Sequence, residues 1–119
     1  MEENREFARR LEKRTLDFSV RIIRLSSQLP KTTEGKVVRN QLTKAGTSIG
    51  ANYRESNRAR SRADFKNKIR ICEGEAAETQ YWLEILMQME WLPKDRVLSE
   101  YDESCELLAL FSTIAKNIK

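Results

Sequence analysis

The sequence contains no histidine, and this absence removes several classes of chemistry. Without an imidazole, the chain lacks histidine-based general acid–base catalysis, Ser-His and Cys-His nucleophile pairs, and most kinds of zinc site. A di-iron bundle needs Glu-x-x-His pairs, and the helical-bundle ribonucleases that depend on an Arg…His motif are excluded as well. We therefore predict a protein that is not an enzyme and that uses no metal or other cofactor.

Proline, glycine and cysteine are also scarce. Two prolines and four glycines in 119 residues favour long uninterrupted helices over a sheet with many turns. The two cysteines, Cys72 and Cys105, are 33 positions apart and lack CxxC spacing. This pattern is typical of reduced, buried thiols, although a disulfide between them stays open.

Long apolar runs are missing too. No run approaches the roughly 18 residues of a membrane span, and the first ten residues contain no apolar signal-peptide region. We expect a cytoplasmic protein without a membrane partner. Its 119 residues, 34% of them charged and 39% apolar, suit one domain over residues 1–119.

What the sequence does have is apolar residues at helical spacing. Four such segments cover roughly residues 4–29, 34–58, 62–90 and 94–117. Pro30 follows the first segment, Thr32 or Thr33 and Ser61 are candidate N-caps, and Pro93 suits a first helical position. Short connections make neighbouring helices antiparallel, so the predicted fold is all-α, an up-down-up-down antiparallel four-helix bundle.

The second segment contains the stretch KAGTSIGANYRES, residues 44–56. Gly46 and Gly50 share one helical face, which would let a neighbouring helix approach closely. A phosphate-binding loop is the alternative, but the GxxxxGK[ST] pattern and a preceding strand are both missing. We therefore interpret the two glycines as packing residues.

Polar residues fall on or beside the buried stripes of the second and third segments. They are Asn52, Glu55, Glu78 and Thr79. Because buried polar groups must be paired, we expect them to form a hydrogen-bonded network between the two helices. Catalytic carboxylates are the alternative, which the absence of histidine disfavours.

Charge is unevenly distributed along the chain. Residues 31–70 hold 11 Lys or Arg and 3 Asp or Glu, whereas residues 71–119 hold 4 and 10. In an up-down bundle, the corner between the second and third helices shares an end with the start of the first helix. The candidate nucleic-acid-binding residues at this end are Arg54, Arg58, Arg60, Arg62, Lys66, Arg9, Arg10 and Lys13. Such an end attracts polyanions, although an ordinary solvated surface is the alternative.

A second apolar stripe on the first helix predicts an interface between copies. Leu16, Val20 and Ile23 lie some 120–160° around the helix from Phe18 of the buried stripe, at about 100° per residue. Trp82 widens the apolar arc of the third helix. Exposed apolar surface of this kind marks an oligomer interface, and a wide single core is the alternative.

Three stretches carry a resemblance to a known family: GTSIGANYRES, ARSRADFKNKI and AAETQYWLEIL. Over roughly residues 4–117, the chain resembles the bacterial proteins encoded within intervening sequences of 23S ribosomal RNA genes. This family includes the accessory protein of diversity-generating retroelements. The resemblance implies a four-helix bundle that assembles as a homopentamer. The retroelement member resembles a nucleic-acid binder that also contacts a reverse transcriptase.

Two functions follow from these observations. The first is an oligomer that binds RNA or DNA through its basic end, without reading base sequence by a known motif. The second is a protein-interaction scaffold that docks an acidic partner, such as a reverse transcriptase. The residues leave both open.

Overall fold

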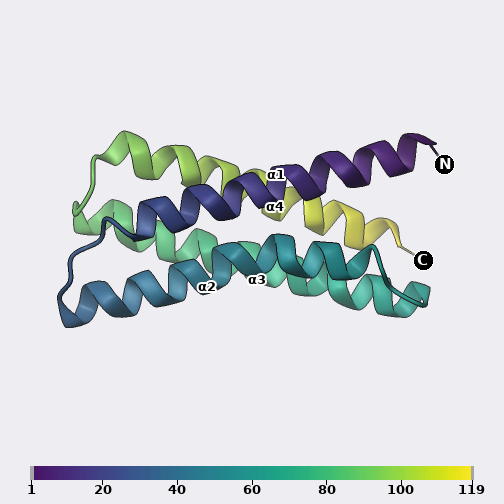
Figure 1. Cartoon of the computed structure of the whole chain (residues 1–119), viewed down its shortest axis with the longest axis horizontal. Helices are drawn as coiled ribbons and strands as arrows, with labels where there is room; N and C mark the ends of the chain where they lie inside the picture. The colour runs from purple at the N-terminus through teal and green to yellow at the C-terminus, as the bar shows by residue number, and fades with distance from the viewer. Residues whose placement is uncertain (1, 119) are drawn as a thin grey trace.

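The computed structural model describes residues 2–118, in which four helices account for the secondary structure. They are α1 (Glu2–Ser26), α2 (Thr33–Ser56), α3 (Arg62–Met89) and α4 (Lys94–Asn117). The helices run lengthwise, and consecutive helices point in opposite directions (Figure 1). The predicted all-α four-helix bundle with up-down-up-down topology is confirmed.

Two of the predicted helix starts are confirmed by their caps. The Thr32 side chain accepts a hydrogen bond from the Gly35 amide at 3.1 Å, which decides between Thr32 and Thr33. The Ser61 side chain accepts from the Asp64 amide at 3.0 Å. Each bond satisfies one of the amides that a helix start leaves without an intrahelical partner.

Several predicted boundaries shift by one to three residues. α1 ends at Ser26 rather than near residue 29, because the Leu29 amide bonds to the Ser26 carbonyl in a tighter turn at 3.1 Å. Pro93 is the N-cap of α4 rather than its first helical residue. Helix ends are the least certain feature of a periodicity argument, since the apolar stripe continues into the turns.

A single apolar cluster fills the centre of the bundle. Phe18 of α1, Leu42 of α2, Leu83 of α3 and Phe111 of α4 are each 0% exposed. All four lie on the stripes that the helical spacing predicts. Within residues 2–118, no helix combines the length and apolar character needed to cross a bilayer.

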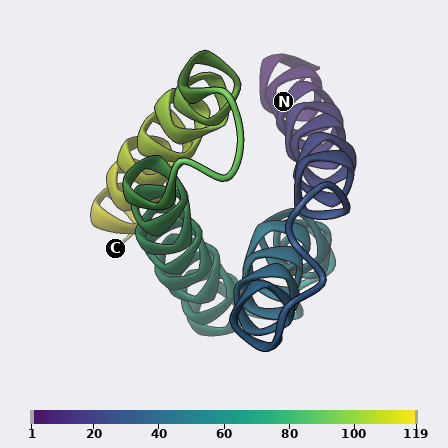
Figure 2. The same cartoon turned by 90° about the vertical axis from the view of Figure 1, so that its left-hand side faces the viewer.

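The four helices pack unequally. The contact of α3 is extensive with both of its neighbours, α2 and α4. The contact between α1 and α2 is somewhat smaller, and the contact between α1 and α4 is the smallest. Seen end-on, the helices form a horseshoe whose two arms are α1 and α4 (Figure 2). The chain therefore has one weakly packed seam, between its first and last helices.

Candidate nucleic-acid interface

The start of α1, the α2–α3 corner and the end of α4 lie at the same end of the bundle (Figure 1). We call this end the basic pole. The segment from residue 50 to residue 68 contributes six Lys or Arg and two Asp or Glu to it. The topology therefore brings together basic residues that are far apart in the sequence, as predicted.

Three arginines of the α2–α3 corner are exposed and lack a carboxylate partner. They are Arg54, Arg60 and Arg62. Within residues 2–118, no ion pair involves any of the three. Their positive charge is available to an external anion.

The other two predicted residues of this corner are partly engaged. Arg58 lies 3.8 Å from the Glu55 carboxylate, one turn away and exposed, so the pair is weak. The Lys66 ammonium is 3.5 Å from the Ile118 carbonyl and helps to close the end of α4. The ion pair of Arg58 is therefore open to solvent, whereas Lys66 is half-buried.

The predicted basic residues of α1 are exposed but partly neutralised within their own helix. Arg9 and Arg10 lie 3.6 and 3.7 Å from the Glu6 carboxylate. Lys13 donates to Asp17 at 3.1 Å. Exposed pairs of this kind contribute little to stability. The nearby carboxylates reduce the positive potential of these cations, which stay exposed to solvent.

Among residues 2–118, the four polar residues of the expected network form no hydrogen bond that joins α2 to α3. On α2, the Asn52 amide donates to the Ser48 carbonyl at 2.8 Å within the same helix. Glu55 is exposed and its carboxylate lies nearest to Arg58. Asn52 is half-buried and Glu55 is exposed, so solvent reaches both side chains.

The α3 members of the expected network are also satisfied locally. The Glu78 carboxylate is exposed and accepts from the Trp82 indole at 3.4 Å. Thr79 is fully buried, but its hydroxyl donates to the Glu75 carbonyl at 2.7 Å. A threonine in a helix can satisfy itself in this way, so its burial does not require a partner on α2.

The second apolar stripe of α1 is on the surface, with Leu16 48%, Val20 37% and Ile23 48% exposed. Trp82 is half-buried: it packs against the core cluster and meets Tyr81 edge-on, with ring centroids 5.3 Å apart. Tyr81 is the more exposed of the two rings. The stripe is thus uncovered in one copy of the chain, while Trp82 is partly covered by its own chain.

Sequence reasoning missed a set of ion pairs that joins α1 to α4. Arg14 donates to both carboxylate oxygens of Glu103 at 2.7 Å and to Glu106 at 2.9 Å. Its hydrogen bond with Glu103 is the main cause of a raised pKa of Arg14. Arg21 donates to Glu100 at 3.0 Å. The sequence did contain a sign of these ion pairs. Arg14 and Arg21 are seven residues apart on α1, and the acidic residues that they meet on α4 are spaced three apart.

Comparison with known proteins decides the family. The family of 23S rRNA-intervening sequence proteins matches residues 10–113. The chain belongs to this family. A solved structure of a protein of unknown function, from the S23 ribosomal protein family of Bacteroides thetaiotaomicron, is 40% identical. The match covers 89% of this chain and 98% of that chain, with a TM-score of 0.82. No curated protein matches the chain.

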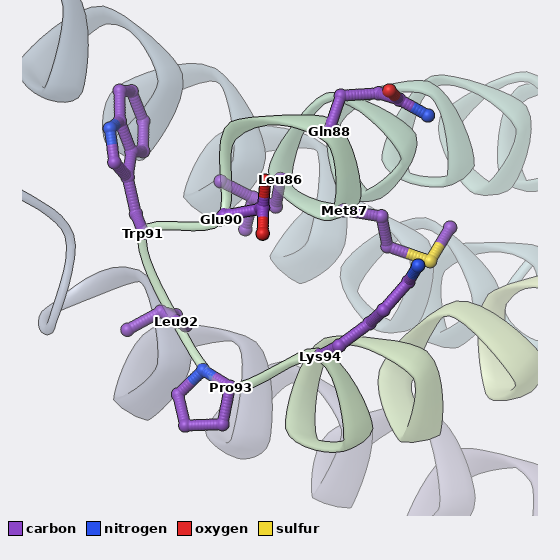
Figure 3. Close-up of a pocket in the computed structure, with 8 residues that line it drawn as sticks. All are labelled: Leu86, Met87, Gln88, Glu90, Trp91, Leu92, Pro93 and Lys94. Atoms are coloured by element: carbon purple, nitrogen blue, oxygen red, sulfur yellow. The ribbon is translucent and has the colours of Figure 1, made fainter.

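In this member of the 23S rRNA-intervening sequence family, a further hollow lies away from the basic pole. It has a volume of about 770 Å³ and sits at the α3–α4 corner. Figure 3 shows its lining, with Trp91 and Leu92 on the connection and Lys94 reaching toward Met87. The ionisable residues of this lining are Glu90 and Lys94.

The two cysteines of this family member differ in burial. Cys72 and Cys105 are both free. Burial raises the pKa of Cys72 to about 12, and its thiol donates to the Ile49 carbonyl at 3.5 Å. Cys105 is only half-buried and accepts from the Gln80 amide at 3.0 Å. The expectation of buried thiols therefore holds for Cys72 and only partly for Cys105.

Proposed function

We propose that this family member is a non-enzymatic protein that binds RNA, or another nucleic acid, through its basic pole. The observation that carries the proposal is the group of exposed arginines at the α2–α3 corner, Arg54, Arg60 and Arg62, which have no carboxylate partner among residues 2–118. Arginine forms bidentate hydrogen bonds with phosphate. A phosphate backbone is a polyanion of matching chemistry.

The contacts expected from this surface are with phosphates. Long arginine side chains on a convex corner reach a backbone without entering a groove, and phosphate contacts carry no sequence information. Binding of this kind releases counterions and weakens steeply as salt rises. We therefore expect low sequence specificity and strong salt dependence.

The test replaces Arg58, Arg60 and Arg62 together by Glu. We expect weaker retention of RNA in a gel shift at moderate salt. A plot of log affinity against log salt should become shallower by about 0.7 for each single-strand phosphate that the variant no longer neutralises. The matched control replaces Lys31, Lys36 and Lys94 by Glu, since these exposed lysines lie at the opposite end of the bundle. Equal binding by the two triple variants would contradict the proposal.

A second candidate function uses the same pole to dock an acidic protein surface, such as a reverse transcriptase. The partly self-paired cations Arg9, Arg10 and Lys13 favour it, because weak pairs are readily exchanged for carboxylates of a partner. A gel shift with purified protein separates the two functions. Only the first predicts that nucleic acid is shifted without another protein.

We also propose that copies of the chain associate through the exposed stripe of Leu16, Val20 and Ile23, with Trp82 at a neighbouring edge. Three large apolar side chains on one helical face are costly to leave in water. The family resemblance implies a ring of five. Light scattering tests this: a mass near 13.9 kDa contradicts association, and about five times that mass supports the pentamer.

A further inference from the structure

A small aromatic hollow opens in the basic pole, between the start of α1 and the α2–α3 corner. Its volume is about 290 Å³. Asn4 and Phe7 line it from α1, Tyr53 and Asn57 from the end of α2, and Phe65 from α3. Three of the nine aromatic residues in the chain therefore meet at its most basic end.

The aromatic rings that line the hollow differ in their exposure to solvent. Tyr53 is 3% exposed and is held edge-on against Phe111, with ring centroids 5.6 Å apart. Phe65 is half-buried, whereas Phe7 is 40% exposed. An aromatic ring exposed beside a preformed cavity has a free face on which a flat molecule can stack.

Polar groups lie at the rim of this apolar surface. The Asn57 amide nitrogen donates to the Glu12 carboxylate at 2.9 Å, which leaves its carbonyl oxygen able to accept a hydrogen bond. The exposed Asn4 amide offers both a donor and an acceptor. An aromatic surface with amide groups at its edge matches the chemistry of a nucleobase, which has two flat faces and a polar edge.

A shallower hollow of about 350 Å³ continues from the first one. It shares Asn4 and Asn57 and adds Arg5, Arg9 and one carboxylate, that of Glu12, which is the acceptor for Asn57. Arg5 forms no ion pair within residues 2–118, and the carboxylates of Glu2 and Glu6 lie 3.6–3.8 Å from Arg9. Cationic side chains thus stand directly beside the aromatic hollow.

We propose that the aromatic hollow binds one unpaired base of a single RNA strand, while Arg5, Arg9 and the corner arginines contact its phosphates. The proposal rests on the proposed function and deepens it. At about 290 Å³, the hollow is just below the usual range of ligand pockets, about 300–1,000 Å³, so it suits one flat ring. Bases of a duplex are stacked and paired, and only a strand with unpaired bases can place one here.

The decisive variant is Phe7→Ala, measured by fluorescence anisotropy with a 12-nucleotide RNA and with the same RNA annealed to its complement. Loss of one stacked base costs about 1–3 kcal/mol, or about fivefold or more in affinity. We expect that loss on the single strand, an unchanged salt slope, and unchanged binding of the duplex. Phe7→Tyr should restore single-strand binding, because it keeps the stacking face.

The matched control is Leu98→Ala, which removes a side chain 44% exposed near the start of α4, at the opposite end of the bundle. It should leave both affinities unchanged. A second measurement uses wild-type protein and a 12-nucleotide RNA whose bases are replaced by abasic sites. Its affinity should fall at least to that of Phe7→Ala with the intact strand. The all-DNA strand should show the same Phe7 dependence, because stacking does not use the 2′-hydroxyl.

The outcomes separate this inference from the proposed function. If Phe7→Ala binds the single strand as well as wild type, or loses affinity equally for strand and duplex, the base site is wrong. The proposed function then still stands, provided that the Arg58, Arg60 and Arg62 variant weakens binding. A Phe7 effect seen only with DNA overturns the assignment to RNA. Failure of the wild-type protein to bind any nucleic acid overturns both proposals.

Discussion

The two sides of α1 are held in physically different ways. Toward α2, the contact depends on glycine: a Cβ atom on Gly46 would stand 2.7 Å from Cγ2 of Ile22, and one on Gly50 would stand 3.1 Å from Oγ1 of Thr15. The missing side chains allow the helices to pack closely. Each glycine costs about 1 kcal/mol of helix propensity relative to alanine, which the close packing offsets.

Toward α4, the same helix packs sparsely and is tied by charged side chains. Arg14 and Arg21 bridge to Glu103 and Glu100, both largely covered. Burial of such ion pairs stabilises the fold less than burial of apolar side chains does, because the charged groups lose their hydration when they are buried. α1 is therefore fixed to the rest of the bundle mainly through α2, and its contact with α4 is adjustable by salt.

The largest expected effect comes from breaking the α1–α2 seam. Gly46→Val adds a branched side chain where Ile22 leaves no room, and overpacking of this kind costs about 1–3 kcal/mol. We expect the free energy of unfolding to fall by about 2 kcal/mol in a urea titration. Gly74→Val is the control, since no neighbouring atom lies within 4 Å of a Cβ there. An equal loss in both variants would show that the seam is not the cause.

A smaller effect should follow from breaking the α1–α4 seam. Arg14→Gln removes the bidentate pair with Glu103, and we expect a loss of about 1 kcal/mol because the site is only partly buried. High salt should shrink the difference between Arg14→Gln and wild type, but it should leave the cost of Gly46→Val unchanged. A double-mutant cycle with Glu103→Gln measures the coupling, and a coupling near zero would refute a stabilising role for the pair.

The smallest effect concerns the α3–α4 seam, which combines apolar packing with a charged contact. The Ser112 hydroxyl donates to Glu73 at 2.6 Å, and this bond, followed by Arg70, lowers the pKa of Glu73. The pKa of Glu73 is thus lower in the folded protein than in the unfolded chain. The ionised carboxylate therefore stabilises the fold above the unfolded pKa, and this contribution is lost as pH falls through the folded pKa. Ser112→Ala should therefore flatten the acid side of the stability curve, and the difference between the variant and wild type should shrink as pH falls. Thermal melts from pH 7 to pH 3 would show this, and parallel curves for the two proteins would argue against it.

Much of the bundle could be predicted because its helices are amphipathic along their whole length. The stripe of α1 through Phe18 and Ile22 is buried as its spacing requires, and the Ser61 cap begins α3 as predicted. The position of the basic pole followed from topology alone, since antiparallel helices with short connections leave no other arrangement.

The polar contacts could not be predicted in the same way. Asn52 and Glu55 lie close to the apolar stripe of α2, and a rotation of a few tens of degrees decides whether such side chains face α3 or solvent. The partner of Arg14 could not be inferred either, because helical spacing describes one helix and says nothing about the residue opposite on another. The aromatic hollow combines residues from three helices, and none of the three segments contains a binding motif.

The sequence alone determined four amphipathic helices, their antiparallel order, the glycine contact face and the end of the bundle where arginines gather. These properties depend on periodicity and chain connectivity, which are local and additive along the chain. Only the tertiary structure decided which cations are paired, which polar groups are satisfied within their own helix, and that Phe7, Tyr53 and Phe65 line one hollow. Those outcomes depend on the rotation and spacing of whole helices, which are fixed by packing of the entire core at once.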